Sequence, residues 1–214
     1  MSELSKILNK AIDRIGMLHD LTDGAAILGS RFEGGRLEQP ATNRLEMEQC
    51  EFIDVELANW ECSDLSMSEV LFRRSAMGNI SWRGAQLQQV EIYRSRLTGW
   101  SLAESTVRYL ALDRCKCDLS VFHHTKFTDC RFVDCDLREA DFQQTGLSRV
   151  TFRNCDLRGA RFPGAKLVDV DFRGSQIADM AIDSSEMIGA SIDHAQLLDV
   201  AQILGLKVGE VGEE

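Results

Sequence analysis

A five-residue register of apolar side chains runs through most of this 214-residue chain. From Ile27 to Leu197 every fifth position is apolar, and Thr42 is the one clearly polar exception among these 35 positions. Because 44% of all residues are apolar, chance would fill fewer than half of the positions in this way. Neither the 3.6-residue period of a helix nor the two-residue period of a strand gives this spacing. The backbone must therefore turn so that every fifth side chain returns to the interior.

A second position of the repeat, two residues before each large one, is small or β-branched throughout the C-terminal half. Its occupants are Ser120, Thr125, Cys130, Cys135, Ala140, Thr145, Val150, Cys155, Ala160, Ala165, Val170 and Ser175. The three remaining positions are mostly polar or charged. A square coil satisfies this pattern: each pentapeptide forms one side, with its large and small residues inside and the others on the corners and outer surface. Sequence repeats of this kind indicate a solenoid.

Several pentapeptides, such as "CDLRE" (135–139), "ADFQQ" (140–144) and "CDLRG" (155–159), follow the pattern A(D/N)LXX. The chain therefore resembles the pentapeptide-repeat family, which implies an all-β solenoid, a right-handed quadrilateral β-helix, over residues 25–192. Four repeats make one coil, so 35 repeats predict nearly nine coils and, at about 4.8 Å per coil, a rod on the order of 40 Å long. Trp60 and Trp100 stand where a small residue is the rule, and Pro40 at another such position. This predicts a swollen or distorted stretch between residues 40 and 110.

Residues 1–24 precede the repeats and are predicted to form an amphipathic helix. Their apolar residues recur at helical spacing: Leu4, Ile7, Leu8, Ala11, Ile15 and Leu18. Because a solenoid must cap its open ends, we expect this helix to cover the first coil. The alternative is a helix that recruits a partner.

Residues 193–214 form a different C-terminal segment, which opens on Asp193 as a predicted helix N-cap and passes through Gly205. Its spacing D-x-x-Q, short apolar helix, G-L-x-V is similar to the tail of the Qnr-type quinolone-resistance proteins and their mycobacterial counterparts. This resemblance implies a short strand at 206–208 before an acidic tail, and a homodimer joined end to end. The residues it implies for dimerisation are Leu197, Leu198, Ala201, Leu204, Leu206 and Val208. The alternative is that the helix only caps the rod.

The sequence contains no catalytic motif, and we predict no catalytic, cofactor-binding or metal-binding residue. All seven cysteines fall on inward positions of the repeat, so they are predicted to be buried apolar fillers rather than metal ligands. His123 and His124 fall on outward positions and are predicted to be solvated. The unpaired cysteines and the absence of a signal peptide or an apolar membrane segment predict a cytoplasmic protein that binds no membrane.

Charge is distributed unevenly along the chain, whose net charge is −10. An acidic surface argues against direct binding to nucleic acid, which needs basic side chains. Between Leu45 and Leu71 there is no lysine or arginine, and the acidic residues are Glu46, Glu48, Glu51, Asp54, Glu56, Glu61, Asp64 and Glu69. Four of them hold the same place in successive repeats, so they should surround one coil: Glu46, Glu51, Glu56 and Glu61.

This acidic collar has two interpretations. It could serve only solubility, or it could imitate the phosphate backbone and occupy a basic DNA-binding surface. The Qnr resemblance implies the second: a non-enzymatic DNA mimic that binds DNA gyrase or topoisomerase IV and protects it from quinolones or natural-product poisons. The alternative function is a protein-interaction scaffold in regulation or signalling.

Overall fold

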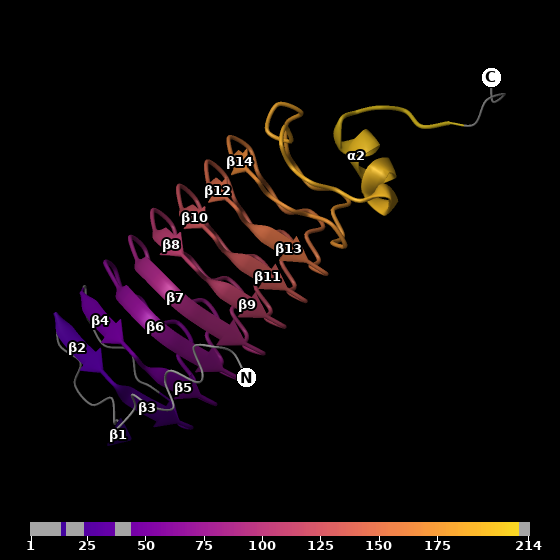
Figure 1. The fold of residues 1–214 in the computed structure, drawn as a ribbon. Coiled ribbons are helices and arrows are strands. Elements are labelled where there is room, and N and C mark those ends of the chain that lie inside the picture. The colour runs from indigo at the N-terminus through magenta and orange to yellow at the C-terminus, as the bar shows by residue number, and fades with distance from the viewer. Residues whose placement is uncertain (1–13, 16–23, 37–43, 210–214) are drawn as a thin grey trace.

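The computed structural model describes residues 14–15, 24–36 and 44–209. These residues form a stack of coils along one axis, and the helix α2 (Leu197–Ile203) lies at the C-terminal end of the stack (Figure 1). Parallel pairing joins each coil to the next, and from β2 onward every pair joins residues 20 apart. The predicted four-sided coil of pentapeptides is therefore confirmed.

Two neighbouring sides of the rod are continuous ladders of strands. The β4 face consists of β2 (Ala25–Leu28), β4 (Leu45–Glu48), the first parts of β6 (Ser66–Arg73) and β7 (Gln86–Tyr93), β8 (Thr106–Arg108), β10 (Lys126–Thr128), β12 (Gly146–Ser148) and β14 (Lys166–Val168). The β5 face consists of β1 (Arg14–Ile15), β3 (Ser30–Glu33), β5 (Glu51–Ile53), the second parts of β6 and β7, β9 (Ala111–Asp113), β11 (Arg131–Val133) and β13 (Thr151–Arg153). Isolated parallel bridges, such as Glu56 to Ala76 and Glu61 to Ser81, form the other two sides.

The interior is filled by stacked columns of the large residues of the repeat. Phe32, Phe52 and Phe72 lie 20 residues apart, and their successive ring centroids are 4.9 and 4.7 Å apart. Trp60 and Trp100 are also buried, although they occupy small positions. The parallel pairing continues past both tryptophans without a shift, so the distortion predicted there is absent from the ladder.

The corners need a left-handed backbone conformation, two residues after each large side chain. Many corners are occupied by residues other than glycine, for example Asn59 at φ 63° and Asp64 at φ 55°. Gly99, at φ 70°, also has a steric reason, because a Cβ there would lie 2.6 Å from Asn79 Oδ1. Glycine at this corner is therefore favoured both by the backbone conformation and by the close approach of Asn79.

The rod is shorter than predicted and its ends differ from the prediction. Seven 20-residue steps separate Ile27 from Leu167 on the β4 face, and residues 183–190 then leave the coil. Leu197 begins α2 and does not fill a core column. At the other end Arg14 and Ile15 form the strand β1, which pairs with β3, so the predicted N-terminal helix does not extend through them. The rest of that helix, Pro40 and the acidic tail lie outside the described residues.

In the described part of the chain, no helix combines the length and the apolar character that crossing a membrane requires.

Candidate protein-interaction surfaces

One coil carries a glutamate at the same repeat position on each of its four sides. Glu46 lies in β4 and Glu51 in β5, whereas Glu56 and Glu61 lie in isolated bridges of the other two sides. This position directly precedes the inward-facing large residue, so its side chain points out of the coil. The four acidic side chains that the repeat register aligned thus lie at one level of the rod, one on each side.

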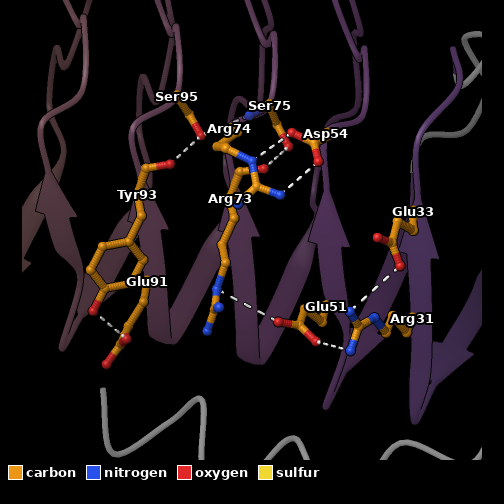
Figure 2. Close-up of polar contacts among 10 residues, drawn as sticks. All are labelled: Arg31, Glu33, Glu51, Asp54, Arg73, Arg74, Ser75, Glu91, Tyr93 and Ser95. Atoms are coloured by element: carbon orange, nitrogen blue, oxygen red, sulfur yellow. Dashed lines mark hydrogen bonds and ion pairs between the residues drawn. The ribbon is translucent and has the colours of Figure 1, made fainter. Parts of the chain in front are cut away.

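These four carboxylates differ in environment. Glu46, Glu56 and Glu61 are exposed, but Glu51 is only 3% exposed and lies between two arginines (Figure 2). Its carboxylate is 3.4 Å from Arg31 Nη1 and 3.6 Å from Arg73 Nε. The two guanidinium groups offset the cost of removing the carboxylate from water. Glu51 therefore belongs to a buried ion cluster and contributes no exposed negative charge.

Two more of the predicted acidic residues have polar partners. Asp54 accepts two hydrogen bonds from Arg74, at 2.7 and 2.6 Å, and this contact lowers the pKa of Asp54. Glu69 accepts a hydrogen bond of 3.0 Å from Gln49 Nε2. The remaining five are exposed and form no ion pair with any other residue that the structure describes. We call these five the exposed acidic patch: Glu46, Glu48, Glu56, Glu61 and Asp64.

Later coils carry many of their acidic residues in pairs with arginine. Asp136, Asp156 and Asp171 each accept two hydrogen bonds from the arginine two residues further on. These arginines lower the pKa of each carboxyl group, chiefly through the hydrogen bonds. Asp129 is paired in the same way with Arg149, which lies one coil further along. The exposed acidic patch lacks such internal counter-charges.

All seven cysteines are free and buried, as the repeat register predicts. Several of their thiols donate to backbone carbonyls: Cys115 Sγ lies 3.3 Å from the Ile92 oxygen, and Cys155 Sγ lies 3.4 Å from the Phe132 oxygen. Burial raises the pKa of Cys130 to about 11. The described residues contain no group of histidine, cysteine and carboxylate side chains arranged to hold a metal ion.

Polar side chains also gather around the outward histidines and in a shallow groove. His123 Nε2 lies 3.0 Å from Asp141 Oδ2 on the outer surface. The groove lies beside the exposed Tyr109, and charged side chains that line it pair with one another. Asp129 bonds Arg149 there, and Arg131 Nη2 lies 3.9 Å from Glu91 Oε1.

The C-terminal segment caps the last coil through Gln196. Within the coils, the Cys155 oxygen accepts from the next coil's backbone nitrogen at 2.9 Å, and the Phe152 oxygen accepts from Ser175 Oγ at 3.0 Å. The corresponding oxygens of the last coil belong to Ser175 and Phe172. Gln196 Nε2 donates to both of them at 2.7 Å. One buried amide thus replaces two donors that a further coil would supply.

Asp193 holds that amide in position. Its side chain accepts from Ala195 N at 2.9 Å, and its own backbone nitrogen donates to Gln196 Oε1 at 2.9 Å. This reciprocal pair is a capping box at the start of the 3₁₀ turn η1 (His194–Gln196), which leads into α2. The predicted N-cap is therefore confirmed.

The outer side of this cap is apolar and uncovered. Of the six residues predicted to mediate dimerisation, Ala201 is half-buried and the other five are exposed. We call these five the C-terminal apolar surface: Leu197, Leu198, Leu204, Leu206 and Val208. The strand predicted at 206–208 is absent, since these residues have no regular secondary structure. An isolated strand has no partner for its backbone groups.

Comparison with known proteins identifies the fold of this chain. Residues 106–182 match the family model described as "Pentapeptide repeat region". Among solved structures, the chain is similar to HetL of the cyanobacterium Nostoc sp., a pentapeptide repeat protein involved in heterocyst differentiation regulation. The two chains are 14% identical, the TM-score is 0.55, and the alignment covers 84% of this chain and 92% of HetL. This chain also matches QnrB1, a plasmid-mediated fluoroquinolone resistance protein, with 14% identity, a TM-score of 0.42, and coverage of 88% and 100%. No curated protein matches the sequence.

Proposed function

We propose that this chain, of which residues 106–182 match the pentapeptide-repeat model and which shares the fold of HetL, is a non-enzymatic DNA mimic. Its partner would be a type II topoisomerase, DNA gyrase or topoisomerase IV, which it would protect from quinolones or natural-product poisons. The observation that carries the proposal is the exposed acidic patch, because its carboxylates lie on three sides of a narrow rod and have no counter-ion among the described residues. The Qnr-like tail from Asp193 to Val208 supports this choice of partner.

The physical basis is competition for a basic surface. A DNA-binding groove lined by lysine and arginine attracts any regular array of negative charge, and release of counter-ions favours the complex. Because exposed charges are screened over about 8 Å at physiological ionic strength, the affinity should fall steeply as salt is added. A patch that served only solubility would give no saturable binding at any salt concentration.

The test is gyrase supercoiling with and without a quinolone, at graded salt. Protection is expected at low salt for the natural sequence, and it should be reduced by about tenfold in a variant that carries Glu46→Gln, Glu56→Gln and Glu61→Gln, since each exposed charge contributes up to about 1 kcal/mol. The matched control carries Glu139→Gln, Asp169→Asn and Asp179→Asn, which removes three exposed acidic residues from distant coils. Absence of binding and protection at low salt would contradict the proposal.

We also propose that two copies associate through the C-terminal apolar surface. Five exposed aliphatic side chains at one end of a rod are unfavourable in water and are typical of an interface. Leu198→Glu should give a monomer by light scattering after size-exclusion chromatography. Leu119→Glu is the control, because Leu119 is similarly exposed, at 53%, in the middle of the rod. An unchanged molar mass for Leu198→Glu would mean that the segment only caps.

A second candidate function is an interaction scaffold in regulation or signalling, with the N-terminal segment as recruiting element. HetL, whose fold this chain shares, is involved in the regulation of a developmental programme. Deletion of residues 1–20 separates the two functions. Loss of partner binding with an intact rod would favour the scaffold, whereas retained gyrase protection would favour the DNA mimic.

A further inference from the structure

One side of the rod carries charged residues whose sign changes halfway along it. This side follows the β5 face in each coil, and we call it the third side. The residues directly before its inward-facing large residues point outward, and parallel bridges stack them one coil apart. From the coil of β6 onward this outward column reads Ala76, Arg96, Lys116, Asp136, Asp156 and Gln176. Two basic residues are thus followed by two acidic residues, with an uncharged residue at each end.

The basic half of the column has no internal counter-charge. Arg96 and Lys116 are exposed, and neither forms an ion pair with another described residue. Neighbouring coils are about 4.8 Å apart, and like charges at directly opposite positions are unfavourable. Asp136 and Asp156 each hold one arginine of their own chain. A carboxylate has lone pairs for further donors, so each aspartate can accept a second cation.

A second copy turned end for end supplies the missing charges. When two third sides face each other about a two-fold axis with the rods antiparallel, each outward column meets the same column in reverse order. Arg96 then lies opposite Asp156 of the second copy, and Lys116 lies opposite Asp136 of the second copy. The outward column on the other side of the large residues also matches, because it places Asp118 opposite an arginine, Arg138 of the second copy.

The match depends on the alignment. A shift by one coil places Lys116 opposite Lys116 of the second copy, or Asp136 opposite Asp136 of the second copy. A parallel pair would leave Arg96 opposite Thr98, without a counter-charge, and would offer Asp136 only an arginine like the one it already holds. The charges therefore favour one antiparallel alignment, with the two-fold axis between the coils of β9 and β11.

We propose that the third side is a self-association surface on which two copies bind side by side and antiparallel. The six coils from Ala76 to Gln176 cover five spacings, about 24 Å, and the side is a single strand wide. Such a contact is smaller than the roughly 800 Å² per partner of a stable interface. Its affinity must come mainly from opposite charges, so the pair should be weak and sensitive to salt.

The test is sedimentation velocity in the Leu198→Glu background, which removes the proposed C-terminal contact. Dimers are expected at about 0.1 M salt, where charges act over about 10 Å, and monomers at about 1 M salt, where they act over about 3 Å. Arg96→Glu with Lys116→Glu should raise the dissociation constant at least about tenfold, since each exposed ion pair contributes up to about 1 kcal/mol. The matched control is Lys126→Glu with Lys166→Glu, which makes the same change of charge at exposed positions of the β4 face.

Mixing two variants tests the alignment itself. The acidic variant carries Arg96→Glu and Lys116→Glu, and the basic variant carries Asp136→Lys and Asp156→Lys. Each variant alone has four like charges in the column and should stay monomeric. An equal mixture should form a heterodimer, because the two columns are then opposite in sign throughout. A parallel pair would not be restored by mixing, since the new lysines would meet arginines of the acidic variant.

Three results would overturn the proposal. Monomers at the lower salt and the highest attainable protein concentration would mean that the third side is only a solvated surface. Association that persists in the acidic variant would place the contact elsewhere, and a mixture that stays monomeric would exclude the antiparallel alignment. If the basic variant does not fold, Asp136→Asn with Asp156→Asn replaces it and should weaken the dimer of the Leu198→Glu chain; an unchanged dissociation constant would contradict the proposal equally.

Discussion

Replacing Gln196 by alanine tests how the rod is closed at its C-terminal end. The side-chain amide donates to the Ser175 and Phe172 oxygens, and its oxygen accepts from the Asp193 backbone. The Ser175 oxygen would lose this donor in a buried site, which costs about 1–3 kcal/mol. The Phe172 oxygen keeps the Ser175 nitrogen at 3.1 Å, so losing the second bond costs about 0.5–1.5 kcal/mol. With the broken capping box, the expected destabilisation is about 2–4 kcal/mol.

The loss should be concentrated in the last coil, because each coil of a solenoid contacts only its neighbours. Hydrogen exchange should therefore accelerate first at the amides of residues 171–182, and a urea titration should show a lower midpoint. Gln202→Ala is the matched control, because Gln202 lies in the same helix and is exposed. If Gln196→Ala costs no more than Gln202→Ala, or if exchange accelerates equally in all coils, the reasoning is refuted.

Three further perturbations have defined outcomes. Gly99→Ala should destabilise the rod by about 1–2 kcal/mol in urea titrations, because φ is positive there and the new Cβ would lie 2.6 Å from Asn79 Oδ1. Gly159→Ala should cost less, because the nearest atom to its Cβ would be 3.5 Å away. Equal losses of stability in the two variants would exclude the clash at Gly99. Arginine contacts lower the pKa of Asp136, Asp156 and Asp171. These carboxylates therefore stabilise the folded state fully above their unfolded pKa of about 3.9, and this stabilisation is lost as the pH falls through their lower folded pKa values. The urea midpoint should decrease when the pH is lowered below about 4, and the decrease should be smaller for Asp156→Asn than for the natural sequence. Ellman's reagent should label none of the seven buried cysteines in the native protein and all seven after denaturation; rapid native labelling of any thiol would contradict the tight core.

The inner half of the structure was predictable because the repeat determines which side chains face inward. The distortion expected at the tryptophans was wrong for a reason visible in their neighbours. Trp60 occupies a position that usually has a small residue, but the next position, which usually has a large residue, is occupied by the smaller Cys62. The large and the small side chain therefore compensate for each other's volume within one repeat. Trp100 makes an edge-to-face contact with Trp82 at 5.6 Å, and such pairs are favourable. At Trp60, the core volume is therefore conserved over two neighbouring positions and not at each position alone.

The contacts of the outward-facing side chains were predictable only where they recur every 20 residues, which is the length of one coil. Arg31 and Glu51 lie 20 residues apart, as do Asp54 and Arg74, so comparison of the outward columns could have identified both pairs. The irregular backbone at 206–208 could not be identified in this way, because these residues lie beyond the repeating coils.

The four sides of a coil are equivalent by the repeat, so any functional difference between them must come from the outward residues. At the level of β5, three sides carry exposed glutamates, and the fourth carries Glu51 neutralised by Arg31 and Arg73. A basic partner attracted by the patch would therefore approach the sides of Glu46, Glu56 and Glu61. The glutamine substitutions at Glu46, Glu56 and Glu61 should therefore reduce gyrase protection, because they remove one exposed charge from each of these three sides.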